Sequence, residues 1–408
     1  MTTEPVGGPL FTRPFKVLAA FVALGIGVVV WRLVVGLGQT TALSDGYPWG
    51  LWISFDVLVG TALGCGGYAV AILVYVLNKG KYHALVRPAI LTSALGYSLA
   101  GFAIVVDVGR WWNLWKVPVA WKLYNLSSVL LEVALCIMAY VAVLWIEVSP
   151  VFLERLQESG PPRIRQMAGR VKGFLEKALL WIIALGLLLP TMHQSSLGAL
   201  FLIAVTKLHP LWLTPWLPLL FLISVVGMGY AVVVFESTLA THFLRRRQEI
   251  EMLSGLSVAV VITTALYLFV RLYDLAYQEH LALAFSADLY AAFFWLEMAL
   301  FVAPMVILAS RRRRSNPGWL FFGAMLMLLA GGLYRFDTSL IAYNPGAQWS
   351  YFPSVPELLV TLGFLSLEIM AYVYLIKRFP ILAGGTAKPP EPAIPSSGAA
   401  TTVAPAHS

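Results

Sequence analysis

The segment that decides the fold is residues 51–77, LWISFDVLVGTALGCGGYAVAILVYVL. It contains one charged residue, Asp56, among 27 positions. A helix rises about 1.5 Å per residue and the hydrocarbon core of a bilayer is about 30 Å thick, so roughly 20 apolar residues cross it. The segment is therefore predicted to be a transmembrane helix. Its embedded carboxylate is a functional candidate, because a charge inside a membrane is costly to keep.

Nine further apolar runs have the same character, so the chain of 408 residues is predicted to cross the membrane ten times. A shorter run, residues 197–205, is about half a span and is expected to be a re-entrant or interfacial piece. No small-residue cleavage site follows the first run, so the first helix is expected to remain in the protein. The nine runs are residues 17–35, 88–106, 123–146, 174–191, 217–235, 253–270, 289–310, 319–334 and 355–376.

The composition excludes most other classes of protein. Hydrophobic residues make up 59% of the chain and charged residues 12%, whereas about a quarter of the residues in a soluble domain are charged. A soluble enzyme, a disordered chain and a nucleic-acid-binding protein are therefore excluded. An outer-membrane barrel is excluded because its strands would alternate apolar and polar residues with a period of two. The predicted fold class is an all-α polytopic membrane protein.

The basic residues determine the predicted orientation. With a cytoplasmic N-terminus, 21 of the 28 Lys and Arg residues fall in cytoplasmic segments, including residues 245–247, residues 311–314 and Lys388. Because positively charged loops stay in the cytoplasm, we predict a bacterial inner-membrane protein with both termini in the cytoplasm. The seven basic residues assigned to the outer side are Arg32, Arg110, Lys116, Lys122, Lys207, Arg271 and Arg335.

The outer segments are rich in aromatic residues, as in residues 46–52, 111–115 and 343–353. An aromatic belt at the membrane interface would account for this density. So would a shaped surface that docks a partner or admits an amphiphile. Residues 383–408 are mostly Ala, Pro, Ser, Thr and Gly. They are expected to form a disordered cytoplasmic tail, because such a composition cannot bury a core.

Polar residues converge on the outer half of spans two to five. Asp56 and Glu132 are expected about two turns below the outer ends of their spans, and His193 and Gln194 at the outer end of span five. Embedded acids farther along the chain are Glu297 and Glu368, with Glu236 and Glu357 nearer helix ends. The converging group is Asp56, Asp107, Arg110, Glu132, His193 and Gln194.

Each of these residues could also serve the structure alone. Asp107 and Arg110 are one helical turn apart and can form a salt bridge at a helix end. Asp56 and Glu132 can be satisfied by hydrogen bonds to neighbouring helices, and His193 by a bond to the backbone. The embedded acids Glu297 and Glu368 can be packing contacts or parts of a proton path.

A quinone site accounts for the group as a whole. A quinone headgroup stacks on flat rings, and its carbonyl oxygens need hydrogen-bond donors. Its reduction takes up two protons with two electrons, so titratable groups must lie within hydrogen-bond reach. Asp56 and His193 are the candidates for headgroup bonding and protonation, Trp49 and Trp52 for the wall of the site. Glu132, Glu297 and Glu368 are the candidates for a proton relay.

Metal cofactors are not expected in this protein. Its two cysteines, Cys65 and Cys136, are too few for an iron–sulfur cluster, which takes about four thiolates. A membrane b-type haem usually needs two facing histidines inside the spans. His193 and His242 are predicted at opposite faces of the membrane, so no haem is expected. A secondary transporter, which would have broken helices at the midplane, is the alternative from another functional class.

Several long motifs carry a resemblance to a known family. The chain resembles the integral membrane subunit of the hydrogenase-2 type of nickel–iron hydrogenase, within the polysulfide-reductase/nitrite-reductase (NrfD) superfamily. The resemblance runs over about residues 9–382. The motifs are residues 46–56 (GYPWGLWISFD), 82–89 (YHALVRPA), 107–113 (DVGRWWN), 189–196 (LPTMHQSS), 344–346 (NPG) and 351–353 (YFP).

The resemblance implies a fold, a partner and a substrate. It implies two four-helix bundles and electron exchange with a ferredoxin-like iron–sulfur subunit at the outer face. That subunit connects to the large and small subunits of a nickel–iron hydrogenase. The resemblance also implies a menaquinone-type quinone in the first bundle, near Trp49, Trp52, Asp56 and His193. Asp107, Arg110 and Glu132 match less specific positions.

We therefore predict a quinone-binding membrane subunit of a periplasm-facing hydrogenase, with a link to proton movement left open. The alternative within the superfamily is the same module serving a molybdopterin oxidoreductase. The predicted divisions are residues 1–16 (cytoplasmic N-terminus), 17–48 (first helix and outer loop), 49–195 (first bundle with the quinone site), 196–340 (second bundle), 341–382 (outer loop and last helix) and 383–408 (tail).

Overall fold

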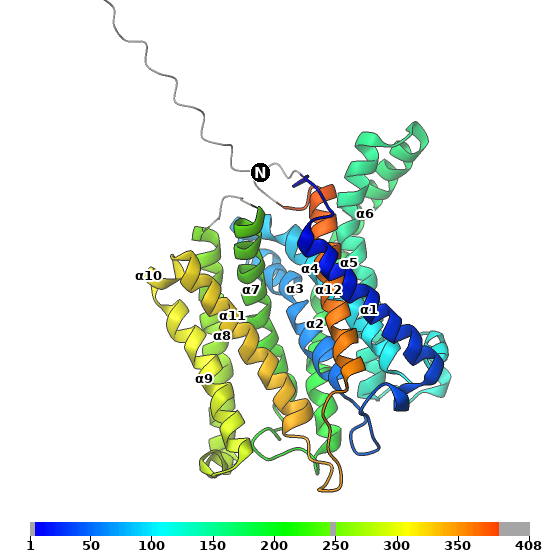
Figure 1. The fold of residues 1–408 in the computed structure, drawn as a ribbon. Helices are drawn as coiled ribbons and strands as arrows, with labels where there is room; N and C mark the ends of the chain where they lie inside the picture. The colour runs from blue at the N-terminus through cyan, green and yellow to red at the C-terminus, as the bar shows by residue number, and fades with distance from the viewer. Residues whose placement is uncertain (1–4, 245–249, 383–408) are drawn as a thin grey trace, which may run out of the picture.

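The computed structural model describes residues 5–244 and 250–382. Ten helical segments in these two ranges are long and apolar enough to cross a membrane (Figure 1). The number and order of the segments agree with the ten predicted apolar runs, so the predicted all-α polytopic fold is confirmed. The basic residues 245–247, Lys388, His407 and the predicted tail lie outside the described residues.

The longer helices cross the molecule side by side, and their ends meet short loops at two opposite faces (Figure 1). The α-helices are α1 (Arg13–Val35), α2 (Gly60–Leu63), α3 (Gly66–Ala71), α4 (Val86–Asp107), α5 (Val129–Ser159), α6 (Pro162–Phe201), α7 (Leu217–Leu244), α8 (Ile250–Tyr277), α9 (Leu289–Ala309), α10 (Arg311–Arg314), α11 (Pro317–Phe336) and α12 (Val355–Arg378).

The second span is irregular along its length. It begins as a π-helix, Trp52–Val59, and continues through the short helices α2 and α3. It ends as a second π-helix, Ile72–Val76. A third π-helical turn, Asp337–Ile341, follows α11. Because π-helical turns are rare and concentrate at functional sites, these segments mark where to look for chemistry.

Helices α5 and α6 are longer than a bilayer requires. The 40 residues of α6 correspond to about 60 Å, roughly twice the hydrocarbon thickness. The α5–α6 hairpin therefore projects beyond the other helices (Figure 1). Helix α6 runs to Phe201 and is followed by the 3-10 turn Leu202–Ala204. Residues 197–205 thus continue the fifth span, and the predicted re-entrant or interfacial piece is wrong.

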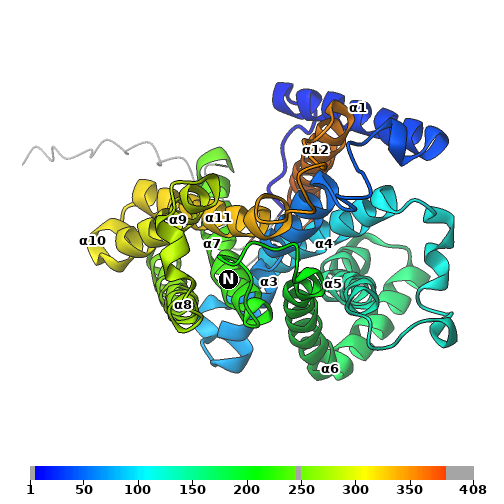
Figure 2. The same ribbon diagram turned by 90° about the horizontal axis from the view of Figure 1, so that it is seen from below.

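Seen along the helices, α7, α8, α9 and α11 gather on one side, α4, α5 and α6 on the other, and α1 pairs with α12 (Figure 2). Helix α3 packs against both α6 and α7. At Gly229 a Cβ atom would lie 2.5 Å from the carbonyl oxygen of Cys65, so this close contact of α7 with the second span requires glycine. The predicted boundary between the two bundles, residues 195 and 196, falls inside α6, which packs on both α5 and α7. The division into two bundles therefore stays a prediction.

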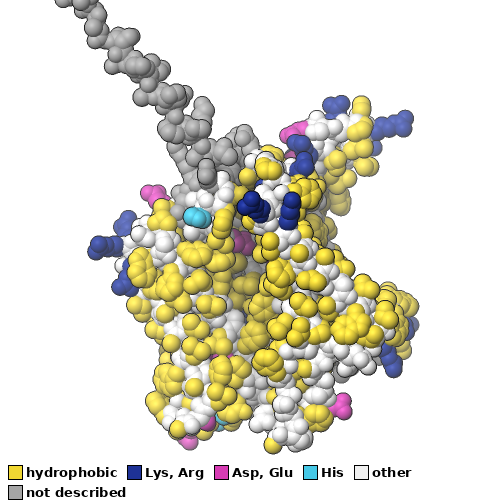
Figure 3. All heavy atoms as spheres, in the orientation of Figure 1, with side chains coloured by type: hydrophobic (Ala, Val, Ile, Leu, Met, Phe, Trp, Pro, Cys, Tyr) yellow, Lys and Arg dark blue, Asp and Glu magenta, His cyan; other side chains and the backbone are white. Residues whose placement is uncertain are grey.

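The surface is consistent with a membrane protein. Hydrophobic side chains cover the middle of the visible face, and many Lys and Arg side chains lie toward the end of the molecule where α1 begins (Figure 3). The charged residues at that end include the α10 segment, Arg311–Arg314. Large apolar side chains such as Phe174, Trp181 and Phe269 are exposed, as expected where a helix faces lipid.

Candidate functional site

Two adjacent polar residues of the LPTMHQSS motif, His193 and Gln194, point into the protein from α6. His193 and Gln194 have no exposed surface. The side-chain amide of Gln194 donates to Thr61 Oγ1 at 3.0 Å and to the Tyr97 hydroxyl at 3.3 Å. The ring of Tyr97 lies 5.6 Å from the imidazole of His193. Both predicted site residues are therefore buried, and α2 and α4 supply the hydrogen-bond partners of Gln194.

His193 is left with no hydrogen-bond partner. Both of its ring nitrogens are buried and unpaired among the described residues. A neutral imidazole has one N–H donor and one acceptor nitrogen. Buried polar groups nearly always have a partner in protein, water or ligand. The ring is therefore suited to receive a ligand.

Arg335 of α11 reaches the same place from the other half of the molecule. It is completely buried, and its guanidinium Nη2 lies 3.5 Å from Gln194 Oε1. Its Nη1 contacts the Gly331 carbonyl at 3.1 Å and the Ser224 hydroxyl at 3.4 Å. None of its hydrogen-bond or ion-pair contacts among the described residues is with a carboxylate.

Thr61, Tyr97, His193, Gln194 and Arg335 form what we call the central polar cluster. Arg335 was not among the predicted site residues, because its position near a span end assigned it to the outer side. The available signal was that Arg335 is the only charged residue of Pro317–Phe336. The site has many hydrogen-bond donors and few acceptors, because the Arg335 guanidinium has no carboxylate partner and the His193 imidazole beside it is unpaired. It suits a neutral ligand with carbonyl oxygens that gains negative charge.

Asp56 points elsewhere. Its Oδ2 accepts a hydrogen bond of 2.7 Å from Thr361 on α12, and Glu368 is a nearby acid. No hydrogen bond joins Asp56 to His193 among the described residues. Trp52 also faces α12, where its indole N–H donates to the Glu357 carbonyl at 3.2 Å. These two predicted residues therefore lie against the last helix and not in the central polar cluster.

The other predicted positions are dispersed. Asp107 faces Arg32 of α1, and Arg110 is exposed, so the considered Asp107–Arg110 salt bridge is wrong. Glu132 is partly buried in the first turn of α5, which begins at Val129. It is therefore less deep than the two turns expected, because the residues before Val129 form loop and not helix.

Trp49 connects the start of the second span to the π-helical turn Asp337–Ile341 that follows α11. Its indole N–H donates to the Ser339 carbonyl at 2.8 Å, and its ring lies 4.9 Å from that of Tyr343. The neighbouring outer motifs also bind one another. The Tyr351 hydroxyl donates to Glu357 at 2.6 Å and accepts from the backbone N–H of Leu51 at 2.6 Å. Burial raises the pKa of Tyr351, so the phenol remains a donor.

The predicted relay acids do not form one continuous path of contacts. Glu297 lies in α9, where it accepts from the Trp212 indole and the Tyr267 hydroxyl. Glu236 of α7 accepts from Thr92 at 2.8 Å. Glu368 of α12 lies near Asp56 and Glu236. Glu132 stands apart from these at the outer end of α5.

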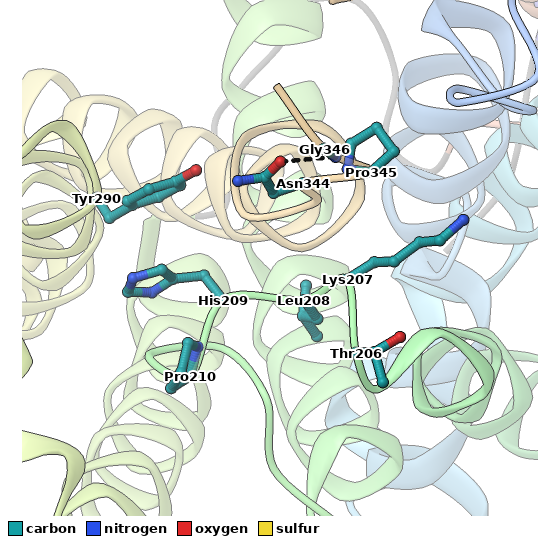
Figure 4. A pocket seen from close by; sticks show the side chains of 9 residues that line it. All are labelled: Thr206, Lys207, Leu208, His209, Pro210, Tyr290, Asn344, Pro345 and Gly346. Atoms are coloured by element: carbon teal, nitrogen blue, oxygen red, sulfur yellow. Dashed lines mark hydrogen bonds between the residues drawn. The ribbon is translucent and has the colours of Figure 1, made fainter. Parts of the chain in front are cut away.

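An open pocket of about 570 Å³ lies between the loop of residues 206–210 and the loop of residues 344–346, beside Tyr290 (Figure 4). Its wall includes His209, whose ring stacks on Tyr290 at 4.2 Å. The Asn344 backbone N–H donates to the Lys207 carbonyl at 2.7 Å and so holds two of its loops together. Burial lowers the pKa of His209, so this histidine is neutral at pH 7. Residues 344–346 were recognised in the sequence as a motif, but their place at a pocket was not predicted.

Comparison with known proteins gives matches along most of the sequence. The polysulphide reductase, NrfD family pattern matches residues 39–341. The "Probable Ni/Fe-hydrogenase 2 b-type cytochrome subunit" of Escherichia coli is 41% identical, over 93% of this chain and 95% of that protein. The "Menaquinone reductase, integral membrane subunit" of Nitratidesulfovibrio vulgaris is 28% identical over 87% of each protein. The C subunit of polysulfide reductase from Wolinella succinogenes is 25% identical over 54% of this chain and 69% of that protein.

The name of the Escherichia coli relative contradicts the expectation that this protein binds no haem, because a b-type cytochrome is a haem protein. The expectation rested on a requirement for two facing histidines. That requirement was too strict, since haem iron is also held by a single histidine or by histidine with methionine. His193, buried with both ring nitrogens unpaired, has the chemistry of an axial ligand. A bound haem would supply one-electron transfer.

Proposed function

The chain belongs to the polysulphide reductase, NrfD family, and we propose that it is the quinone-binding membrane subunit of a nickel–iron hydrogenase complex. The family is one of membrane subunits of redox complexes, and the described residues include ten candidate spans. The relative with 41% identity is named for nickel–iron hydrogenase 2, and another relative is named for menaquinone reduction. These names support both halves of the proposal.

The observation that carries the proposal is the central polar cluster. His193 offers an unpaired N–H, and Arg335 offers a guanidinium that has no carboxylate. Both are donors that a quinone carbonyl can accept from, and Tyr97 supplies a flat ring beside them. Because His193 has no exposed surface, a headgroup reaches it only when neighbouring side chains move.

The charge balance of quinone reduction suits this arrangement. Two electrons and two protons convert the two carbonyls into hydroxyls, and negative charge builds on the oxygens before each proton arrives. A buried guanidinium stabilises that charge more strongly than it would in water, because the surroundings have a low dielectric constant. Gln194 connects Arg335 to the rest of the cluster: its amide oxygen accepts from the guanidinium, and its amide nitrogen donates to Thr61 and Tyr97. Asp56, beside Thr361 and near Glu368, is the proposed entry for protons along α12.

The proposed electron donor is an iron–sulfur subunit at the outer face, linked to the hydrogenase large and small subunits. The outer loops that carry Trp49, Tyr351 and the pocket around His209 are the surface available to it. The proposal places the protein in a bacterial inner membrane with both termini in the cytoplasm.

The alternative, in which the same membrane subunit serves a molybdopterin oxidoreductase, is less well supported, because the polysulfide reductase relative matches 54% of this chain at 25% identity.

Substitution of His193 tests the proposal. The complex purified with His193→Gln is expected to lose H2-dependent reduction of 2,3-dimethyl-1,4-naphthoquinone and to keep H2-dependent reduction of the dye benzyl viologen. His83→Gln is the matched control, because His83 is exposed at the opposite face from the cluster. Equal quinone turnover in the His193→Gln and His83→Gln complexes would remove His193 from the quinone site.

A further inference from the structure

The second half of the chain buries a group of charged side chains that the proposed quinone site does not use. Arg271 and Asp274 lie on α8, Glu297 on α9, and Tyr334 and Asp337 at the end of α11. Each of the five is at most 2% exposed. Glu297 is eight residues beyond the start of α9, which is about 12 Å along the helix. We call these five residues the Glu297–Asp337 cluster.

Glu297 is the fully partnered member of the cluster. Its Oε2 accepts from the Trp212 indole at 2.8 Å, and its Oε1 accepts from the Tyr267 hydroxyl at 2.7 Å. The Arg271 Nε lies 3.9 Å from Oε1. Two hydrogen-bond donors and the guanidinium of Arg271 are thus directed at the Glu297 side chain.

The remaining members have polar atoms without partners. Both carboxyl oxygens of Asp337 are unpaired among the described residues, as are Asp274 Oδ2, Arg271 Nη2 and the Tyr334 hydroxyl. Donors and acceptors are thus both unpaired in the same group. Groups that could satisfy each other but do not touch are typically joined by buried water, which makes two to four hydrogen bonds.

Asp337 faces Glu297 and Arg271. Arg271 is one positive charge facing the carboxyl groups of Glu297, Asp274 and Asp337, so Asp337 needs another positive charge or a proton. A metal ion does not meet this need, because the described residues contain no group of three or more His, Cys, Asp and Glu side chains that could hold one. We propose that the Glu297–Asp337 cluster binds water and one exchangeable proton, held on Asp337.

One chain of contacts links the cluster to the pocket around His209. Trp212, which donates to Glu297, also donates its backbone N–H to the His209 carbonyl at 2.9 Å, and the two rings lie 6.0 Å apart. His209 lines the open pocket (Figure 4). In the transfer a hydronium in the pocket gives its proton to a carboxylate oxygen of Asp337 through bridging water, and no electron moves. The step needs no quinone, so it goes beyond the proposed function.

Infrared difference spectroscopy of the purified complex in phosphatidylcholine nanodiscs tests the proposal. Exchange of H2O for D2O lowers the carbonyl-stretch frequency of a protonated carboxylic acid that can exchange its proton. We expect such a band in the unsubstituted complex. We expect it to be lost in Asp337→Asn, and kept but displaced in Tyr334→Phe, which removes one neighbouring hydroxyl. Glu279→Gln is the matched control and should leave the band unchanged, since Glu279 is exposed just beyond α8.

Two results would overturn the proposal. One is a spectrum of Asp337→Asn that matches the unsubstituted complex in the carboxylic-acid region. The other is an Asp337-dependent band that does not shift in D2O over hours. If Asp337→Asn fails to assemble, an undisplaced band in Tyr334→Phe counts against the proposal. The readout requires no quinone turnover, so its failure is distinguishable from failure of the proposed quinone site.

Discussion

Replacement of Arg335 by Met should separate quinone chemistry from stability. Met keeps the length of the side chain and removes every donor. The Arg335 guanidinium lies 3.1 to 3.5 Å from its five acceptor atoms, and none of these bonds can form with Met. Gly331 and Phe221 contribute helix carbonyls, so Gln194 Oε1 is the acceptor left without a partner. An unpaired buried acceptor costs about 1–3 kcal/mol.

The opposing effect is of similar size. Removal of the buried guanidinium relieves its desolvation cost; for scale, replacing a buried ion pair by apolar side chains of similar volume is neutral or stabilising by about 1–4 kcal/mol. The free energy of unfolding of Arg335→Met should therefore stay within about 2 kcal/mol of the unsubstituted protein. Loss of one hydrogen bond from a charged donor to a reduced quinone oxygen costs about 1.5–3 kcal/mol. At about 1.4 kcal/mol per factor of ten, quinone reduction should slow by about 10- to 150-fold.

The assay compares thermal unfolding of the purified complex with its H2-dependent quinone reduction. Arg335→Lys is the matched variant. It keeps the charge but not the planar fork of donors, so its turnover should fall between the other two. A melting temperature that falls in step with turnover would refute the reasoning, because Arg335 would then act only on the structure. Unchanged turnover in Arg335→Met would refute it as well.

Three further predictions concern helix packing, pH and Asp56. Gly25→Ala should destabilise the protein by about 1–3 kcal/mol, because the added Cβ would lie 3.0 Å from the Gly363 Cα. Gly27→Ala should stabilise it by about 0.5–1 kcal/mol, because a Cβ there meets open space. Equal shifts of the melting temperature in the two variants would contradict this prediction. Burial lowers the pKa of folded His209, so the stability that this residue contributes is present above the unfolded pKa of about 6.5 and decreases as pH falls below it. The melting temperature of the unsubstituted protein should therefore fall more between pH 7.5 and 5.5 than that of His209→Gln, and parallel curves would argue against it. Asp56→Asn should slow quinone reduction and spare dye reduction, with a pH profile that differs from that of the unsubstituted complex; an unaltered rate and profile would exclude Asp56 from proton delivery.

The fold was predictable because its signal is local and repeated. An apolar run such as residues 51–77 is long enough to cross a bilayer whatever its neighbours are. The distribution of Lys and Arg among the loops gave the predicted orientation of the spans. The prediction failed at residues 197–205, because a run that continues a longer helix has the same composition as an independent half-span.

The candidate site was only partly predictable, because it depends on which way each helix faces. His193 and Gln194 were singled out because an adjacent polar pair is rare in an apolar span and costly to bury, and the structure buries both. Asp56 was expected beside them but faces α12. It lies in the π-helix Trp52–Val59, where bonds from residue i to i+5 break the 3.6-residue periodicity used to assign faces.

The arginines show a second limit of reasoning from the sequence. Arg271 and Arg335 were assigned to the outer side, and both are buried. Long basic side chains near a span end normally reach the membrane interface, so a charge count cannot distinguish them from buried ones. Their partners come from other spans, such as Gln194 for Arg335 and Glu297 for Arg271.

Photolabelling with an azido-substituted naphthoquinone tests the central claim most directly. The complex is irradiated in nanodiscs and the labelled peptides are identified by mass spectrometry. We predict that the label attaches within residues 189–196 or close to Arg335, and that excess unlabelled naphthoquinone prevents it. Displaceable labelling confined to the α1–α12 face around Thr361 would contradict a quinone site at His193.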